Sequence, residues 1–265
     1  MKVIKRDLSR DLAKVEIHTL ADLHIGDAHC DLNLIKDRIK CIAENENAYA
    51  ILAGDIINNS TKTSIGDVYS EVLTPMEQLQ RAVELLSPIK DKILCVVNGN
   101  HELRTWRMDG IDLLGLICEQ LGIGNLYSPT SAVLFLRFGT QERGHYETNG
   151  SGNVRMMCYT LFVNHGSGGG RKEGAKAIRL ADMASIVDTD IYIHAHTHLP
   201  MIFKERFHRI DVRNSAIAIV DKLFVNSSAM LKYGGYGEAQ EYKPASTDSP
   251  IIVLSGTKKQ FNAHL

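Results

Sequence analysis

The stretch Tyr49-Ala50-Ile51-Leu52-Ala53-Gly54-Asp55 decides the fold of this chain. Its five leading apolar residues predict a short buried strand. Gly54 ends that strand, because glycine permits a close backbone approach or an unusual backbone angle at a turn. Asp55 then places a carboxylate directly after a buried strand. Polar residues at the ends of buried strands indicate a functional edge of a sheet.

The same arrangement recurs on both sides of this stretch. Residues 15–20 and 93–97 are further apolar strands, and Asp22 and Asn100 follow them closely. Strands that alternate with helices predict parallel pairing with crossover helices. Because ligands gather at the carboxyl ends of such strands, we expect these polar side chains to meet at one edge. The helices of this half are predicted at 31–44, 75–87 and 109–121.

The second half of the sequence has a different pattern, in which short strands follow one another with little helix between them. Only 175–184 shows helical character. The pattern predicts an antiparallel sheet that packs on the first one. We expect residues 1–265 to form a single domain, with the metal-site core at about 15–226 and a C-terminal loop and strand at 227–265. The strands are predicted at 133–138, 154–163, 191–193, 201–207, 216–220, 223–225 and 251–254.

The composition suits a protein with a full hydrophobic core. The chain has 265 residues, of which 44% are hydrophobic, and a formal net charge of −1. This balance argues against a strongly basic surface that coats nucleic acid, although a local basic groove stays open. No apolar stretch approaches the roughly 18 residues of a membrane span, and no signal peptide is evident. The five cysteines form no C-x-x-C pair, which favours reduced thiols and a cytoplasmic location.

Side chains that bind metal ions are concentrated after the predicted strands. Asp22 and His24 are two residues apart, so both face one side of an extended segment, and the same holds for His196 and His198. Asp55 has two carboxylate oxygens and can bridge two ions. Two ions roughly 3.5–4 Å apart are suited to an in-line displacement at phosphorus. Further oxygen and nitrogen donors are Asn100 and His165.

Taken in order, these motifs resemble those of the calcineurin-like metallophosphoesterase superfamily. The likeness extends over most of the chain, and the combined pattern is highly specific. It implies an α/β fold built as a four-layer α-β-β-α sandwich, with two mixed β-sheets packed face to face and flanking helices. The matching blocks are Asp22-Leu23-His24, Gly54-Asp55, Gly99-Asn100-His101-Glu102, His165 and His196-Thr197-His198.

The resemblance also implies a ligand set and a mechanism. One ion would be held by Asp22, His24, Asp55 and His198, and a second by Asp55, Asn100, His165 and His196. A hydroxide that bridges the ions would attack phosphorus, and His101 would stabilise the transition state or protonate the leaving oxygen. The expected catalytic residues are therefore Asp55, Asn100 and His101. The expected cofactors are two divalent metal ions, with Mn²⁺ first and Fe, Zn²⁺ or Ni²⁺ as the family's other choices.

Two features depart from the family pattern or leave it open. Ala195 stands where the family usually has glycine before the last His-x-His, and a methyl group is a small change. His194 creates a second possible register, His194-x-His196. The continuation Thr197-His198-Leu199-Pro200 fits the family and favours His196 and His198.

The sequence predicts a phosphate-ester substrate but leaves its kind open. Gly-Asn-His-Glu resembles Ser/Thr protein phosphatases, yet the Asp-Arg-Gly continuation of those enzymes is missing after Asp55. We therefore favour a phosphodiesterase or nuclease acting on nucleotides or DNA over a phosphomonoesterase. A non-catalytic metal-binding scaffold is the alternative from another class. Asn58 and Arg104 are the candidate substrate contacts, because Arg suits bidentate binding of phosphate.

Overall fold

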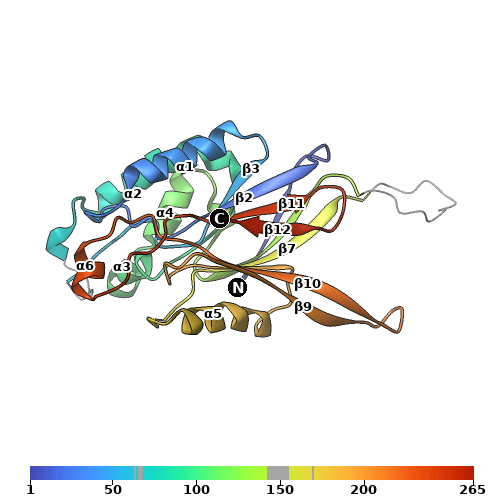
Figure 1. Ribbon diagram of the computed structural model, residues 1–265. Helices are drawn as coiled ribbons and strands as arrows, with labels where there is room; N and C mark the ends of the chain where they lie inside the picture. The colour runs from blue at the N-terminus through green and yellow to red at the C-terminus, as the bar shows by residue number, and fades with distance from the viewer. Residues whose placement is uncertain (63, 65–67, 142–154, 169) are drawn as a thin grey trace.

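The computed structural model describes residues 1–62, 64, 68–141, 155–168 and 170–265. Within these residues the chain forms two six-stranded sheets that pack face to face, with helices on the outer sides (Figure 1). Helices α1, α2 and α4 cover one sheet, and α5 covers the other. The expected α/β sandwich of two mixed sheets is confirmed. The helices are α1 (Leu32–Glu44), α2 (Pro75–Leu86), α3 (Glu102–Asp109), α4 (Leu113–Gln120), α5 (Glu173–Asp182) and α6 (Gly235–Ala239).

The first sheet combines strands from the first half of the chain with the two strands at the end of the chain. Its order is β12-β11-β2-β3-β4-β5, in which β2 to β5 run parallel. Strand β11 pairs antiparallel with β2, so residues after 250 complete this sheet instead of forming an appendage. The strands are β2 (Lys14–Leu20), β3 (Ala48–Leu52), β4 (Ile93–Val97), β5 (Tyr127–Ser128), β11 (Ile251–Ser255) and β12 (Phe261–His264).

The second sheet is mixed, so the antiparallel pairing predicted from its short strands is wrong. Strand β7 pairs parallel with β8 because α5 crosses between them, and β8 pairs parallel with β10. The predicted strands at 216–220 and 223–225 are one strand, β10, that pairs without a break with β9. The order is β1 (Lys2–Asp7), β6 (Ser131–Phe138), β7 (Met157–Asn164), β8 (Ile191–His194), β10 (Ala216–Asn226), β9 (Met201–Asp211).

The predicted helix at 109–121 is in fact the second of two helices. Gly110 ends α3 in a left-handed conformation, with φ of +71°. Asp112 then caps α4, because its side chain accepts a hydrogen bond from the Gly115 amide at 2.9 Å. The helical pattern of 102–109 is obscured in the sequence by the polar motif that begins it. Short 3₁₀ helices in the described chain are η1 (Val68–Ser70), η2 (Ser87–Lys92), η3 (Gly124–Leu126) and η4 (Met183–Ser185).

The main hydrophobic core lies between the two sheets and beneath the helices of the first one. Ile17, Ile51 and Leu161 are fully buried there. A smaller cluster, which includes Phe162 and Tyr192, lies between the second sheet and α5. Burial of such side chains contributes about 1.5–3 kcal/mol each. Among the described residues, no helix is both long and apolar enough to cross a membrane.

Candidate metal centre

The backbone at the motif residues is left-handed, which the sequence did not reveal. Asp22, His24, Asp55, His196 and His198 have φ between +48° and +62°. They are five of the eight non-glycine residues with positive φ among the described residues. Such angles cost free energy in a residue with a side chain and concentrate at functional sites. The motif residues are therefore not in extended backbone, and the extended segments expected from the two-residue spacing are wrong.

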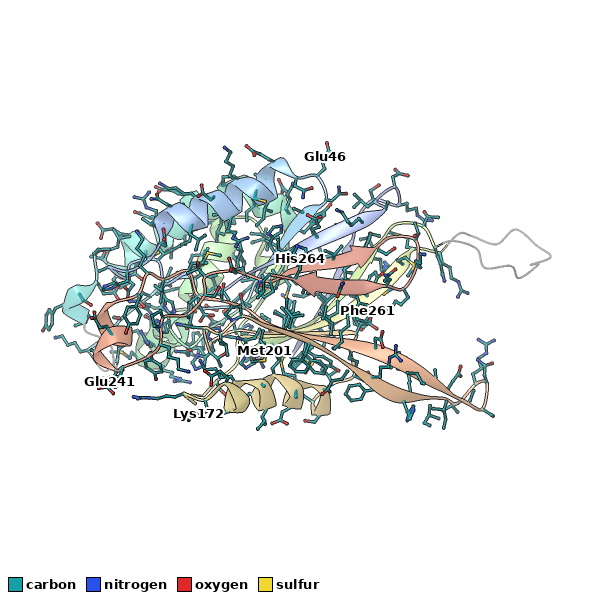
Figure 2. All side chains as sticks on the ribbon, viewed as in Figure 1. Glu46, Lys172, Met201, Glu241, Phe261 and His264 are labelled. Carbon is teal, nitrogen blue, oxygen red and sulfur yellow. The ribbon has the colours of Figure 1, made fainter. Side chains whose placement is uncertain are left out.

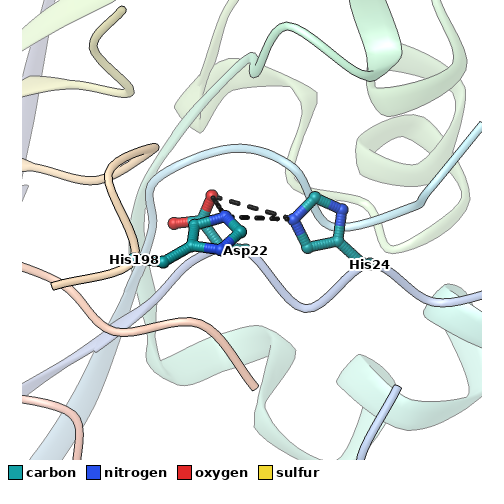
Figure 3. Close-up of side chains that lie close together, drawn as sticks. All are labelled: Asp22, His24 and His198. Carbon is teal, nitrogen blue, oxygen red and sulfur yellow. Dashed lines mark hydrogen bonds and ion pairs between the residues drawn. The ribbon is translucent and has the colours of Figure 1, made fainter. Parts of the chain in front are cut away.

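Asp22, His24 and His198 form a first cluster after β2 and β8 (Figure 3). His198 Nε2 lies 3.2 Å from Asp22 Oδ1 and 3.4 Å from His24 Nε2. Asp22 is fully buried, and its Oδ1 has no hydrogen-bond partner among the described residues. Its other oxygen accepts a hydrogen bond from the His196 amide at 3.1 Å. One carboxylate oxygen and two imidazole nitrogens therefore converge on one point.

Asn58 fixes the orientation of the His24 ring. Its Oδ1 lies 3.1 Å from His24 Nδ1, while its Nδ2 donates to Glu71 at 2.5 Å and to Asp27 at 3.3 Å. Because two carboxylates take the Nδ2 donors, Oδ1 must face His24, and His24 Nδ1 carries the proton. The lone pair of His24 is then on Nε2, toward the cluster. These contacts favour a positioning role for Asn58 over the substrate contact that the sequence suggested.

A second cluster contains Asp55, His165 and His196. His165 Nε2 lies 3.2 Å from Asp55 Oδ2 and 3.0 Å from Asn100 Oδ1, and its Nδ1 donates to the Ala53 carbonyl at 2.7 Å. Asp55 also lies within reach of His24 and His101, so it belongs to both sides of the site. The structure thus brings together all seven side chains that the sequence proposed as metal ligands.

The electrostatics of the second cluster attract positive charge. Burial alone would lower the pKa of His165, but the Asp55 carboxylate more than offsets this and raises the pKa to about 10. Burial lowers the pKa of His196 to about 4 and that of His24 to about 3, which keeps both rings neutral near pH 7. Neutral imidazoles beside ionised carboxylates are the ligand forms that divalent cations require, so His165 would release its proton when an ion binds.

His101 lies at the edge of the two clusters and is held by α3 and its neighbours. Its Nδ1 donates to the Asn58 carbonyl at 2.6 Å, and its amide donates to Asp55 Oδ1 at 2.9 Å. Arg104, one turn further along α3, donates from Nη2 to His101 Nε2 at 2.8 Å. Arg104 also donates to the Asn58 carbonyl at 3.0 Å. The guanidinium group is therefore within reach of the same space as the His101 ring.

Glu102 connects the loops after β3 and β4, a role that the sequence analysis did not predict. Its carboxylate is fully buried and accepts hydrogen bonds from four amides, those of Asp55, Ile56, Ile57 and Gly99, at 2.6–3.1 Å. The loops approach so closely that a Cβ on Gly54, whose φ is +88°, would lie 2.7 Å from Gly99 Cα. Burial, and then the charge of Asp55, raise the pKa of Glu102 to about 7.

His194 lies beside the clusters and outside them. Its Nδ1 is 2.7 Å from Asn226 Oδ1, and the Asn226 amide nitrogen donates to Thr197 and Leu199. Ala195 is absent from the positive-φ residues, so the glycine usual at this position is not needed for backbone reasons. Ala195 instead donates from its amide to the His165 carbonyl at 3.0 Å.

The residues present fit a divalent metal ion. Asp22 Oδ1 and His24 Nε2 are both acceptors and lie 3.9 Å apart, and the part of the chain that the structure describes offers this buried oxygen no donor. Buried acceptors that face one another are stable when a cation satisfies them. Nitrogen and carboxylate oxygen donors in this mixture suit first-row divalent ions such as Mn²⁺, Fe²⁺ and Zn²⁺.

Comparison with known proteins agrees with this geometry. Residues 23–200 match the family model of calcineurin-like phosphoesterases. This match spans most of the chain and includes every residue of the two clusters except Asp22. The chain belongs to the calcineurin-like phosphoesterase family, whose members use divalent metal ions.

Several solved structures resemble the chain at low identity. A metallophosphoesterase from Sphaerobacter thermophilus is 12% identical, with 91% of this chain and 84% of that chain covered and a TM-score of 0.40. The nuclease MPE of Pseudomonas putida is 13% identical, covers 94% and 87%, and has a TM-score of 0.36. Vps29 of Chaetomium thermophilum is 13% identical, covers 94% and 96%, and has a TM-score of 0.41. A search of curated proteins gives no match.

Proposed function

We propose that this chain is a dinuclear metal-dependent phosphodiesterase or nuclease-type hydrolase. The proposal rests on the position of Asp55 between two groups of side chains. On one side it lies within reach of His24 and His101, and on the other side within reach of His165 and His196. A carboxylate so placed suits a bridge between two ions. One ion would be held by Asp22, His24, Asp55 and His198, and the other by Asp55, Asn100, His165 and His196.

The side chains around the clusters would bind and orient the ester. When bound, the two ions, with Mn²⁺ as our first choice, would supply the Lewis-acid charge that lowers the pKa of an attacking water. His101 would stabilise charge on the ester from the ring position that Asn58 and Asp55 fix. It would protonate the leaving oxygen when its Nε2 carries a proton in place of the hydrogen bond from Arg104. Arg104 would contact phosphate, because its guanidinium already reaches His101 Nε2.

The choice of a diester substrate rests on the loop after Asp55. That loop reads Ile56-Ile57-Asn58-Asn59, and it lacks the arginine found there in Ser/Thr protein phosphatases. Its side chains are buried, and the Asn58 side-chain oxygen accepts a hydrogen bond from His24 Nδ1. A phosphomonoesterase of the protein-phosphatase kind is the alternative. Nucleotides or DNA are the proposed partners, and the five cysteines, all described and all free, are consistent with a cytoplasmic location.

Substitution of Asp55 tests the proposed mechanism. We expect Asp55→Asn to abolish hydrolysis of bis(p-nitrophenyl) phosphate, because an amide has one oxygen and no charge to bridge two cations. We expect His101→Ala to lower the turnover number by about 10²–10⁴ with the metal content unchanged. Full activity in either variant, with a native circular dichroism spectrum, would contradict the mechanism.

Metal analysis separates the enzyme from the non-catalytic scaffold. We expect close to two ions per chain after incubation with Mn²⁺, and a preference for a diester over a monoester in assays matched for leaving group. A chain that binds ions and hydrolyses neither ester would support the scaffold. Preference for p-nitrophenyl phosphate would instead support the phosphomonoesterase.

A further inference from the structure

Strands β9 and β10 form a ribbon that extends beyond the sandwich (Figure 1). Strand β8 pairs with β10 only along Leu223–Asn226, so the outer part of β10 has β9 as its one strand partner among the described residues. Contacts with the rest of the chain reach Phe207, which packs against the cluster of Phe162 and Tyr192. Lys204 donates to the Phe261 carbonyl of β12 at 2.6 Å (Figure 2 labels Met201 and Phe261, where β9 and β12 begin). A two-stranded ribbon alone is marginally stable in water.

The outer ribbon carries apolar side chains that nothing in the described chain covers. Ile210 and Ile217 lie directly opposite each other, and Ile219 follows on the same face. These side chains are 63–66% exposed, and Val212 at the turn is 84% exposed. Beyond its own two strands, the described chain therefore gives this end of the ribbon little support.

The outer edge of β9 is suited to pairing with another strand. Strand β9 is the last of its sheet in the described structure, runs for 11 residues, and pairs with β10 without a bulge. It contains no proline. Long regular edges without bulges or proline are ready templates for a further strand, and natural proteins normally interrupt them.

The charges of β9 select a second copy of the same strand as that partner. If two copies pair antiparallel about Phe207, Glu205 lies opposite Arg209 of the other copy, twice by symmetry, and Phe207 lies opposite itself. Centring on Arg206 would place two arginines opposite each other. Centring on His208 would place Glu205 opposite Asp211. Opposite charges and aromatic pairs stabilise directly opposed positions, and like charges destabilise them.

We propose that this chain forms a two-fold dimer in which the β9 edges pair antiparallel, centred on Phe207. The contact joins two six-stranded sheets into one continuous sheet and converts each outer ribbon into part of a four-stranded one. The outer ribbon points away from α3 and α6 (Figure 1).

Charge exchange along β9 tests the dimer. We expect the native chain to sediment as a concentration-dependent dimer in analytical ultracentrifugation. Arg209→Glu should weaken the dimer at least about tenfold, because it places like charges opposite each other at two symmetric positions. The double variant Glu205→Arg/Arg209→Glu restores opposite charges and should restore the dimer. Arg213→Glu, with the same charge change in the hairpin turn, is the matched control and should leave the dimer intact.

Cross-linking tests the register independently of the charges. Residues directly opposite on paired strands have Cα atoms within the distance that a disulfide spans. The variant Phe207→Cys should therefore form a disulfide-linked dimer on oxidation. The native chain, treated in the same way, is the control for cross-linking through its own five cysteines. A native chain that stays monomeric throughout the concentration series would overturn the proposal. So would a double variant that remains as weak as Arg209→Glu, since Arg209 also pairs with Asp188 within its own chain.

Discussion

His198 has a backbone conformation that glycine adopts more easily. Its φ is +53°, and its side chain is about one third exposed, so little packing compensates for the angle. In such a conformation a Cβ costs roughly 1 kcal/mol relative to glycine. The residue therefore lowers the stability of the metal-free chain in return for a metal-binding side chain.

Alanine variants are usually more stable than glycine variants, and we expect this order of stability to be reversed at position 198. The metal-free His198→Gly variant should unfold at higher temperature than His198→Ala, by the few degrees that about 1 kcal/mol provides. Differential scanning calorimetry measures the difference. The same pair of substitutions at exposed Lys40, within α1, should give the ordinary order with alanine more stable. Equal transition temperatures at position 198 would count against backbone strain.

Asn58 determines which ring nitrogen of His24 carries the lone pair. It contacts Nδ1 and not Nε2, the nitrogen that faces the metal centre. We expect Asn58→Leu to weaken Mn²⁺ binding by about 10–100-fold, because His24 Nδ1 loses its acceptor and the ring loses its fixed orientation. Isothermal titration calorimetry gives the affinity directly. Asn125→Leu, at an exposed position in η3, is the control. If Asn58 only bound substrate, the metal affinity would stay unchanged and KM would rise.

At the scale of elements, α3 connects two loops of the site through its first residue. Glu102 accepts four amide hydrogen bonds from the chain after β3 and β4. We expect Glu102→Gln to lower the free energy of unfolding by about 1–3 kcal/mol for each amide left unsatisfied, because the new NH₂ group faces donors. Urea unfolding measures this, and Glu84→Gln on the exposed side of α2 is the control. A change in the free energy of unfolding no larger than that of the control would show that the loops do not depend on Glu102.

The element pattern also explains where prediction failed. The parallel strands β2, β3 and β4 were predicted well, because each is a short apolar run and helices with clear periodicity separate them. Strand β1 and the final strand β12 were missed, since their alternation is short and half exposed. The residues 142–154, within which the strand predicted at 154–163 begins, lie outside the described structure.

At the scale of the whole molecule, the C-terminal strands decide whether the chain is one domain. Strand β11 pairs with β2, directly before the motif Asp22-Leu23-His24, so the end of the chain stabilises the beginning of the site. We expect one cooperative unfolding transition, with circular dichroism and the fluorescence of Trp106, the single tryptophan, giving the same midpoint. Removal of residues 251–265 should abolish the folded state. Two separate midpoints, or a stable truncated chain, would contradict a single domain.

The sequence by itself determined the family, the parallel half of the fold and the identity of the side chains that converge. It could do so because those features are local: apolar runs, helical periodicity and polar motifs at strand ends. Only the tertiary structure decided the strand order and pairing of the second sheet, the left-handed backbone at five motif residues, and the hydrogen bonds of Asn58 and Glu102. The five residues are Asp22, His24, Asp55, His196 and His198. These depend on which segments distant in sequence come together, and spacing along the chain carries no information about that.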